Sequence, residues 1–370
     1  MKLLSIILLF SSFLYAKYLS NESCKECHED IYYEYQSSYH AKTYFNDELH
    51  RKVANKASTK TYDCAVCHMP GAKNLKEIVA GERRVNENNE DERDAISCIY
   101  CHQIAYVKKS HEFNSNIRAK NVEGYKPNMY GTLENPDDSD KHAMLNNPIY
   151  DKNVCIGCHS HKRNKNDVLI FQTIQDNQDA TECIKCHMPL ISGGPEKNNK
   201  RGRLEHHSHT FDGIHSLEMV KNAVELHAKN SSDSLTVTIV NKMPHPLIIQ
   251  AARLKYLDIK IVRDGKTIWR NFKNSPTEDK QGAFYLEFLD ENDQKVIIPS
   301  NAKKRGFVNN LKAKETKELL YNTPKIQTGD TIEVALYVVL AKPDCLNAIT
   351  LKDPDLTKPK LMQEYSYKVQ

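Results

Sequence analysis

The sequence lacks a strong excess of charge of either sign. Its 370 residues carry 52 lysines and arginines against 48 aspartates and glutamates, which gives a formal net charge of +4. This near balance gives no electrostatic reason to expect nucleic acid or an anionic membrane as a partner. The chain is long enough for two modest domains, and a hydrophobic content of 39% is not that of a disordered protein.

Apolar segments long enough to cross a membrane are also lacking after the N-terminus. The first residues, MKLLSIILLFSSFLYA, carry Lys2 ahead of an apolar run that ends at the small residue Ala16. This pattern predicts a secretory signal peptide over residues 1–16. The alternative is an uncleaved anchor, for which the run is short of the roughly 20 residues that span a bilayer. We expect an exported protein of the periplasm, in a Gram-negative type of envelope, with no transmembrane span after signal cleavage.

What the sequence does contain is cysteine in a repeated pattern. Ten of its 11 cysteines form five copies of Cys-x-x-Cys-His, where about 0.01 copies are expected by chance. Two thiols at this spacing can each add to one vinyl group of a haem, and the next residue then presents its imidazole to the iron. We therefore predict five covalently bound haem c groups. The five motifs, in chain order, are Cys24, Cys27 and His28 (motif 1), Cys64, Cys67 and His68 (motif 2), Cys98, Cys101 and His102 (motif 3), Cys155, Cys158 and His159 (motif 4), and Cys183, Cys186 and His187 (motif 5), the histidine being the proximal iron ligand in each.

Other uses of these cysteines explain the pattern less well. Disulfides are the default in an exported protein, but they do not require a fixed pair spacing. Zinc sites use paired Cys-x-x-Cys units without needing a histidine directly after the second cysteine. A thiol redox centre would not be repeated five times. Cys345 stands outside the motifs and is interpreted as a buried or free thiol.

The segment after motif 1, CKECHEDIYYEYQSSYHAK, carries a second histidine, His40. The absence of glycine and proline predicts a helix from His28 to Lys42, with Glu29 and Asp30 in its first turn. Twelve helical residues rise about 18 Å, so His28 and His40 cannot hold the same iron from opposite faces. As an iron ligand, His40 would serve a different haem.

This segment resembles the opening motif of multihaem cytochromes c related to the tetrahaem cytochrome that accepts electrons from hydroxylamine oxidoreductase. The family pattern is Cys-x-x-Cys-His, an aromatic-rich helix and then Ser-x-His-Ala, which corresponds to Ser38 to Ala41 here. Similar segments are CHMP at Cys67 and Cys186, SCIYCHQI near Cys98, and HSHTFDG from His207. The resemblance covers roughly residues 20–250. It implies that His40 and His209 are distal haem ligands.

Enough histidines remain to give every iron a second ligand. Sixteen histidines less five proximal ones leave eleven. His142 repeats the His-Ala pair ahead of motif 4, while His111 and His215 are weaker candidates. His245 is either a haem cap from the C-terminal side or a turn residue, and His161 could reach only a neighbouring haem. The candidate distal ligands are thus His40, His142, His209, His111 and His215, whereas His50, His206, His207 and His227 are interpreted as neighbours.

The short spacing of the motifs leaves little polypeptide for an ordinary apolar core, so the haems themselves should form the core of a helical, loop-rich domain. After about His215 strand patterns take over: SLTVTIVNK, a hairpin around Asp264-Gly265, AFYLEFLD, KVIIP, KELLYN and TIEVALYVVL. SLEMVKNAVELHAK, 216–229, is predicted as a helix whose later half could equally begin a strand. The expected fold is α+β: signal peptide 1–16, pentahaem domain 17–215 and an immunoglobulin-like β-sandwich 216–370. The sandwich has no Cys-Trp-Cys pattern, and the single Trp269 lies in the predicted hairpin.

Two classes of function fit these features. The first is an electron carrier with mostly bis-histidine haems, which exchanges electrons with periplasmic redox proteins or a membrane quinol dehydrogenase. The second is an oxidoreductase that acts on a small nitrogen or sulfur compound at one open haem. All five motifs end in histidine and none is Cys-x-x-Cys-Lys, the site that supplies lysine to the active iron of pentahaem nitrite reductases. We expect the carrier, with no catalytic residue; a subunit that docks the haems onto a larger complex is compatible with it.

Overall fold

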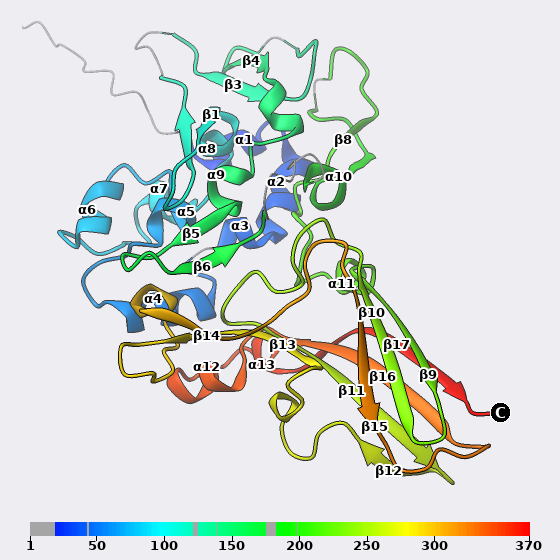
Figure 1. Ribbon diagram of the computed structural model, residues 1–370. Coiled ribbons are helices and arrows are strands. Elements are labelled where there is room, and N and C mark those ends of the chain that lie inside the picture. The colour runs from blue at the N-terminus through cyan, green and yellow to red at the C-terminus, as the bar shows by residue number, and fades with distance from the viewer. Residues whose placement is uncertain (1–18, 43, 121–124, 138, 175–182, 198) are drawn as a thin grey trace, which may run out of the picture.

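The chain folds into two parts that lie one above the other (Figure 1). The computed structural model describes residues 19–42, 44–120, 125–137, 139–174, 183–197 and 199–370. We call residues 19–215 the N-terminal part and 216–370 the C-terminal part; the domain boundaries themselves stay a prediction. The signal peptide predicted at 1–16 lies outside the described residues. Within those residues, no helix has the length and apolar character needed to cross a membrane.

Short helices dominate the N-terminal part. Its α-helices are α1 (Asn21–Lys25), α2 (Glu29–Ser37), α3 (Tyr39–Lys42), α4 (Glu48–Ala57), α5 (Ala65–His68), α6 (Leu75–Ala80), α7 (Glu90–Arg93), α8 (Cys98–His102), α9 (Ile156–His159) and α10 (Cys183–His187), with the 3-10 helix η1 (Pro148–Asp151). Each motif lies on or beside one helical turn. In motifs 1, 2 and 4 the histidine N–H donates to the carbonyl of the first cysteine, at 2.9, 3.0 and 2.9 Å. One turn brings residues i and i+3 to the same face, so both thiols of a motif point the same way.

The helix predicted from His28 to Lys42 is interrupted. It ends at Ser37, and Ser38 adopts an extended backbone with φ −76° and ψ 160°. The Ser38 hydroxyl then accepts from the N–H of Ala41 at 3.4 Å, which starts the separate turn α3. A serine at such a position competes with the helix by bonding to nearby backbone groups. As a result, His40 leaves the line of α2.

The N-terminal part also contains small sheets that the sequence patterns did not predict. Among the described residues of this part, four two-stranded pairs form: β1 (Ile104–Lys108) with β2 (Ser115–Arg118), β3 (Asn128–Gly131) with β4 (Ala143–Asn146), β5 (His161–Arg163) with β6 (Leu169–Gln172), and β7 (Leu190–Ser192) with β8 (Glu205–His207). Only β3 and β4 pair in parallel. These strands are three to five residues long, too short to show the period-2 pattern on which strand prediction depends.

The C-terminal part is built on two larger antiparallel sheets. One has the order β15-β10-β9, and the other β14-β13-β11-β16-β17, with β12 paired to β11. The elements are α11 (Leu217–Lys221), β9 (Val224–Asn230), β10 (Ser234–Asn241), β11 (Leu254–Arg263), β12 (Lys266–Arg270), η2 (Pro276–Glu278), β13 (Ala283–Leu289), η3 (Pro299–Asn301), β14 (Lys304–Asn309), β15 (Thr316–Asn322), β16 (Thr331–Val339), α12 (Pro343–Ala348), α13 (Pro354–Thr357) and β17 (Lys360–Lys368). The mixed α+β fold is confirmed, and the closer likeness to immunoglobulin domains stays a prediction.

The apolar core of the C-terminal part lies between its two sheets. Val237 and Ile239 of β10 and Leu257 and Ile259 of β11 are each 0% exposed and belong to one cluster. Alternate residues of β10 are buried, as expected for strands with one face on a core. The hairpin predicted at Asp264-Gly265 joins β11 to β12, with positive φ at both residues (48° and 74°), as a type I′ turn requires.

Two sequence predictions differ from the structure in this part. The segment 216–229 begins as helix α11 and continues as strand β9, so the strand alternative applies to its later half. KVIIP forms no named strand. It contacts β13 through an isolated bridge between Lys295 and Leu289 and through the Val296 N–H, which donates to the carbonyl of Phe288 at 2.9 Å. Pro299 opens the 3-10 helix η3 directly after it, and a proline cannot donate to a ladder.

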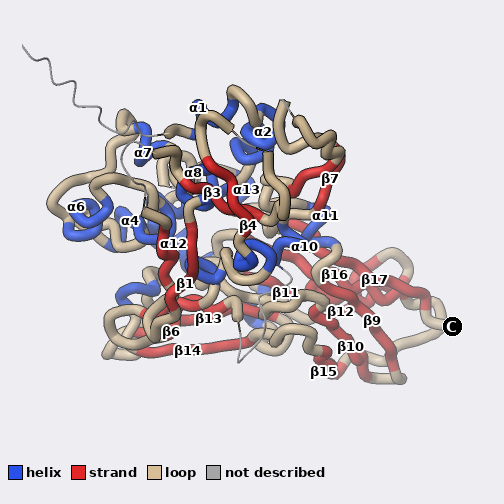
Figure 2. The backbone as a smooth tube through the Cα atoms, turned by 90° about the horizontal axis from the view of Figure 1, so that it is seen from above, coloured by secondary structure: helices blue, strands red, loops and turns tan. Residues whose placement is uncertain are grey.

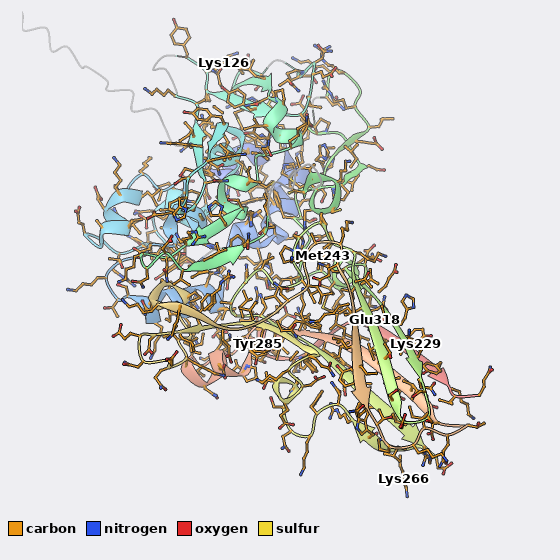
Figure 3. The ribbon with its side chains drawn as sticks, viewed as in Figure 1. Lys126, Lys229, Met243, Lys266, Tyr285 and Glu318 are labelled. Carbon is orange, nitrogen blue, oxygen red and sulfur yellow. The ribbon has the colours of Figure 1, made fainter. Side chains whose placement is uncertain are left out.

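Hydrogen bonds tie the two parts together at several places. The Glu48 carboxylate, on α4, accepts from the backbone N–H groups of Lys352 and Asp353, both at 2.9 Å. The Asn164 side chain donates to the carbonyl of Ala302 at 2.8 Å. Seen from above, strands β9, β10 and β15 extend away from the N-terminal part, whereas β13 and β14 appear beside β6 in this view (Figure 2). Met243 lies where the parts meet, between Lys126 at the far end of one and Lys266 at the far end of the other (Figure 3).

Candidate functional site

Each of the five motif histidines faces a second histidine from elsewhere in the chain. In four of these pairs the ring centres are separated by similar distances: 6.3 Å for His28 and His142, 6.2 Å for His102 and His209, 5.9 Å for His159 and His40, and 6.5 Å for His187 and His245. The interplanar angles are 27°, 22°, 55° and 22°. The members of a pair come from residues far apart in sequence, so the fold creates these pairs.

This separation fits an iron held between two imidazoles. Two metal–nitrogen bonds of about 2.0–2.1 Å, with about 1.1 Å more from each nitrogen to its ring centre, place the ring centres about 6.3 Å apart. Rings that merely stack would lie closer together. The four pairs therefore have room for one metal ion each, and bis-histidine haem iron suits them because one member of each pair directly follows the cysteines of a motif.

Second partners orient several of these rings. Nδ1 of His28 lies 2.7 Å from the carbonyl oxygen of Pro195, and Nδ1 of His102 lies 2.7 Å from that of Tyr130. Nδ1 of His209 and of His245 face backbone carbonyls at 2.7 and 3.0 Å. A ring that donates its Nδ1–H to a carbonyl keeps the lone pair on Nε2, and this is how protein metal sites fix the tautomer of a histidine ligand.

Burial keeps several of the paired histidines neutral. It lowers the pKa of His40 and His209 to about 3 and that of His142 and His245 to about 4. Among the motif histidines, burial likewise lowers the pKa of His102 and His159. A protonated imidazole has no lone pair for a metal, so these environments hold the form that binds iron at neutral pH.

Motif 2 differs from the other four. Its His68 faces His50 on α4, and the ring centres are only 3.8 Å apart at an angle of 44°. No metal ion fits between rings at that separation, so this pair does not match the bis-histidine arrangement. His50 also contacts Asp47, whose carboxylate oxygen lies 3.4 Å from its Nδ1. Burial opposes the ionisation of Asp47, but hydrogen bonding to His50 outweighs it and lowers the pKa of Asp47.

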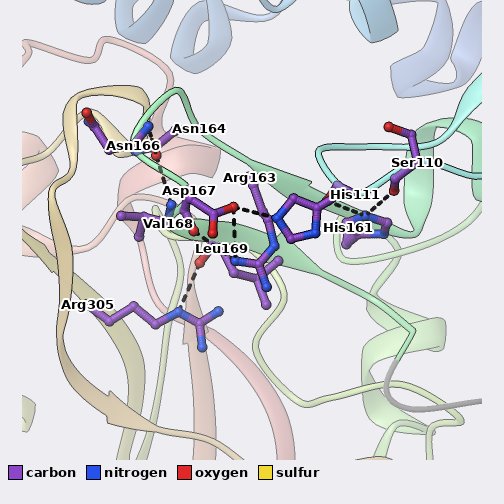
Figure 4. Close-up of polar contacts among 10 residues, drawn as sticks. All are labelled: Ser110, His111, His161, Arg163, Asn164, Asn166, Asp167, Val168, Leu169 and Arg305. Atoms are coloured by element: carbon purple, nitrogen blue, oxygen red, sulfur yellow. Dashed lines mark hydrogen bonds and ion pairs between the residues drawn. The ribbon is translucent and has the colours of Figure 1, made fainter.

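Two candidate distal ligands lie in other settings. His111 is exposed, and its Nε2 contacts the Asp167 carboxylate at 2.7 Å, which Arg163 also contacts (Figure 4). The ring of His215 stacks on that of Tyr39 with centres 3.4 Å apart, and its Nδ1 lies 3.6 Å from Asp355. The structure therefore brings neither of them into one of the five pairs, whereas His40, His142 and His209 each belong to one.

In the two remaining pairs, the second histidine is His245, which faces His187, and His50, which faces His68. His245 lies in the turn between β10 and β11, where sequence reasoning left a haem cap and a turn residue equally open. His50 had been interpreted as a neighbour. The sequence near His50 offered one local pattern, an aspartate three residues before it. In the structure this residue, Asp47, caps α4 by accepting from the His50 N–H at 3.0 Å. That pattern marks a helix start but does not indicate a ligand.

Glu34, on α2, fixes the loop that carries His209. One of its carboxylate oxygens accepts from the His209 N–H at 2.8 Å, and the other lies 3.0 Å from Nε2 of His206. His206 is 7% exposed, and its Nδ1 lies 2.9 Å from the carbonyl oxygen of Gly193. A carboxylate thus connects the helix after motif 1 to the distal side of motif 3.

Contacts between cysteines show which attachment sites are neighbours. The thiols of Cys24 and Cys98 are near neighbours that affect each other's pKa, as are those of Cys67 and Cys158. Contact with Cys183, burial and the nearby Cys101 together raise the pKa of Cys155. Motif 1 therefore lies beside motif 3, motif 3 near motif 4, and motif 4 beside both motif 2 and motif 5. Because a thioether sulfur marks a porphyrin edge, sites in this order would bring their haem edges close together.

The chain is similar to known proteins in sequence over one segment and in fold over most of its length. The sequence profile of the family described as cytochrome c554 and c-prime matches residues 23–103. Among curated proteins, none matches this chain. The crystal structure of a penta-heme cytochrome c552 from Thermochromatium tepidum aligns with a TM-score of 0.75 at 22% identity, covering 95% of this chain and 99% of that chain. A superoxide reductase structure covers 40% of this chain and 87% of that chain at 8% identity, and its TM-score of 0.18 is too low to support an argument. The resemblance to multihaem c-type cytochromes is confirmed.

Proposed function

We propose that this protein is a periplasmic electron carrier with five covalently bound haem c groups. The observation that carries the proposal is the set of four histidine pairs separated by 5.9 to 6.5 Å, each with one member directly after a haem-attachment motif. Iron with two strong protein ligands has no open position for a substrate, and it changes oxidation state with little rearrangement. Such haems pass electrons and do not bind reactants.

The order of the motifs supports transfer within the molecule. Motifs 1, 3 and 4 form a continuous series, and motifs 2 and 5 both adjoin motif 4. An electron received at one end of this series could reach either branch without leaving the protein. We infer that the external partners are a periplasmic redox protein or a membrane quinol dehydrogenase, and that the C-terminal sheets form an immunoglobulin-like sandwich which closes the haem-bearing part.

A reductive titration of the purified holoprotein tests the carrier function. With titanium(III) citrate as reductant, we expect each chain to take up five electrons. The reduced protein should then stay reduced in the presence of nitrite, hydroxylamine or sulfite. Rapid and repeated reoxidation by one of these compounds would show turnover and would contradict the proposal.

One observation favours a second candidate, an oxidoreductase acting on a small nitrogen or sulfur compound. The 3.8 Å separation of His50 and His68 leaves motif 2 without the geometry of the other four sites. If His50 does not hold the iron there, that haem can bind an external ligand. Carbon monoxide added to the reduced holoprotein separates the two functions: the carrier binds none, and the oxidoreductase binds one equivalent per chain.

A further inference from the structure

A lysine occupies a core position in the C-terminal part. Side chains alternate along β11, so Lys255 points to the same face as Leu257 and Ile259, which lie in the apolar core between the sheets. Its neighbours across the sheet are Val338 on β16 and Phe284 on β13, both 0% exposed. Lys255 itself is 6% exposed. Pattern alone would place an apolar residue at this position.

Lys255 has no carboxylate partner among the residues that the structure describes. Its Nζ donates to the carbonyl oxygen of Leu247 at 2.6 Å. Burial, and secondarily the neighbouring cation Arg253, lower the pKa of Lys255 to about 7. Arg253 is partly buried, and its Nη1 donates to the carbonyl oxygen of Leu340 at 2.6 Å. Burying a cation without a counter-charge destabilises a fold, and apolar residues commonly do better at such positions. The lysine therefore calls for an explanation other than packing.

The hydrogen bond to Leu247 places the positive charge of Lys255 close to a candidate haem site. Leu247 is two residues after His245, a distance of at most about 7 Å along the chain. The turn is held rigidly: the Asn241 side chain donates to the carbonyl of His245 at 2.9 Å, and the Leu247 N–H donates to the carbonyl of Leu311 at 2.9 Å. The ring of His245 in turn faces His187 of motif 5. The buried cation thus lies close to the histidine that faces motif 5.

We propose that Lys255 sets the reduction potential of the haem attached at Cys183 and Cys186, and makes that haem the electron sink of the protein. This inference rests on the proposed function. When one electron passes from the neighbouring haem of motif 4, that donor is oxidised from ferrous to ferric and the acceptor is reduced from ferric to ferrous. The acceptor loses one unit of positive charge, so a fixed cation nearby stabilises its reduced form.

The size of the effect follows from the distance. A unit charge on the order of 10 Å from the iron, at the effective dielectric constant of about 20 in a protein, changes the reduction equilibrium by more than tenfold. For a one-electron couple, a tenfold change corresponds to about 59 mV. The attachment site of motif 5 is a suitable place for electrons to leave the protein, because Cys186 is exposed, whereas the other nine motif cysteines are only partly accessible. An electron that collects here is close to solvent and to an external acceptor.

Redox titration of variant holoproteins tests the inference at pH 6, where Lys255 is protonated. Lys255→Met removes the charge and keeps the length of the side chain, Lys255→Arg keeps the charge, and Lys260→Gln removes a partly exposed cation from the same strand as a matched control. Midpoints are followed optically and by electron paramagnetic resonance. We expect Lys255→Met to lower the midpoint of one haem by about 59 mV or more, and the other two variants to leave all five midpoints near their original values. Unchanged midpoints in a five-haem Lys255→Met protein would overturn the inference.

A second measurement does not depend on that variant folding. In His245→Gly, the low-spin signal of one haem should disappear, and the missing component should be the one that is reduced first in the unmodified protein. Disappearance of a component with a lower midpoint would overturn the inference while leaving the proposed function intact. A mass that corresponds to fewer than five haems in the unmodified protein would instead contradict the proposed function.

Discussion

Replacing His245 with glycine tests whether the C-terminal part supplies an iron ligand. The 6.5 Å separation of the His187 and His245 ring centres leaves room for one metal ion. A bond through that ion would close a loop of about 60 residues between the two parts. By the chain-entropy relation for cross-links, closing such a loop contributes about 4 kcal/mol. This is an upper value, because a coordinate bond can dissociate.

We expect His245→Gly to convert one low-spin haem into a high-spin haem, without loss of haem mass. The melting temperature of the C-terminal sheets, followed by circular dichroism, should fall by roughly 10 °C. Added imidazole can enter the space left by the side chain, and it should restore the low-spin signal without rejoining the two parts. Spin state would then recover while the melting temperature would not.

A control variant separates ligation from general damage. His227→Gly removes an exposed histidine from strand β9 of the same part, where its ring contacts only that of Tyr365 among the described aromatic residues. It should leave the spin state of every haem as it is in the unmodified protein. If His245→Gly keeps the number of low-spin haems and the melting temperature of the unmodified protein, His245 does not ligate iron and the assignment of this pair is wrong.

Three further predictions follow from particular contacts. Glu34→Ala removes the acceptor of the His209 N–H and should perturb one low-spin signal in electron paramagnetic resonance, with a loss of about 1–3 kcal/mol in stability. Glu34→Gln keeps an acceptor oxygen and should largely restore the signal and the stability. Equal effects of the two variants would refute this role of Glu34. In the folded protein the pKa of Lys255 is lowered to about 7, so the unfolded chain binds one more proton than the folded chain between about pH 7 and 10.4. The free energy of unfolding should therefore rise with pH in that window, by several kcal/mol. Denaturant titrations at pH 7 and 9.5 should show this rise in the unmodified protein but not in Lys255→Met, and an equal rise in both would contradict the prediction. A Cβ added at Gly157 would lie 1.8 Å from Oδ1 of Asn116. Gly157→Ala should therefore displace Asn116 from Cys158 and reduce the yield of protein that carries all five haems, and the second substitution Asn116→Ala should restore that yield. A normal haem count in Gly157→Ala alone would refute the steric argument.

The motifs and the longer strands could be predicted because their signals are local. Cys-x-x-Cys-His needs only five consecutive residues, and β10 shows its alternation within eight residues. The hairpin at Asp264-Gly265 is likewise encoded by two neighbouring residues. The length of the predicted helix was enough to exclude that His28 and His40 hold the same iron, even though Ser38 interrupts that helix in the structure.

The pairing of histidines could not be predicted in the same way, because it depends on contacts between distant residues. His142 and His28 are brought together by a parallel strand pair and long loops whose sequences carry no periodic signal. His245 depends on how the C-terminal part docks, which rests on contacts such as that of Glu48 with the N–H of Asp353. His111 was a reasonable candidate from its spacing after motif 3, yet an exposed carboxylate, Asp167, engages its ring. Lys255 carried a local signal that was missed, since it breaks the apolar series Leu257, Ile259 and Ile261.

The most direct test of the central claim combines the intact mass of the holoprotein with spin-counted electron paramagnetic resonance of its oxidised form at low temperature. We expect a mass equal to the mature chain plus five haems, and low-spin signals that integrate to at least four irons per chain. The remaining iron, at motif 2, decides between the carrier and the oxidoreductase: a fifth low-spin signal supports the carrier, and a single high-spin signal supports the alternative. Fewer than five haems, or more than one high-spin iron, would contradict the account of four irons held between paired histidines.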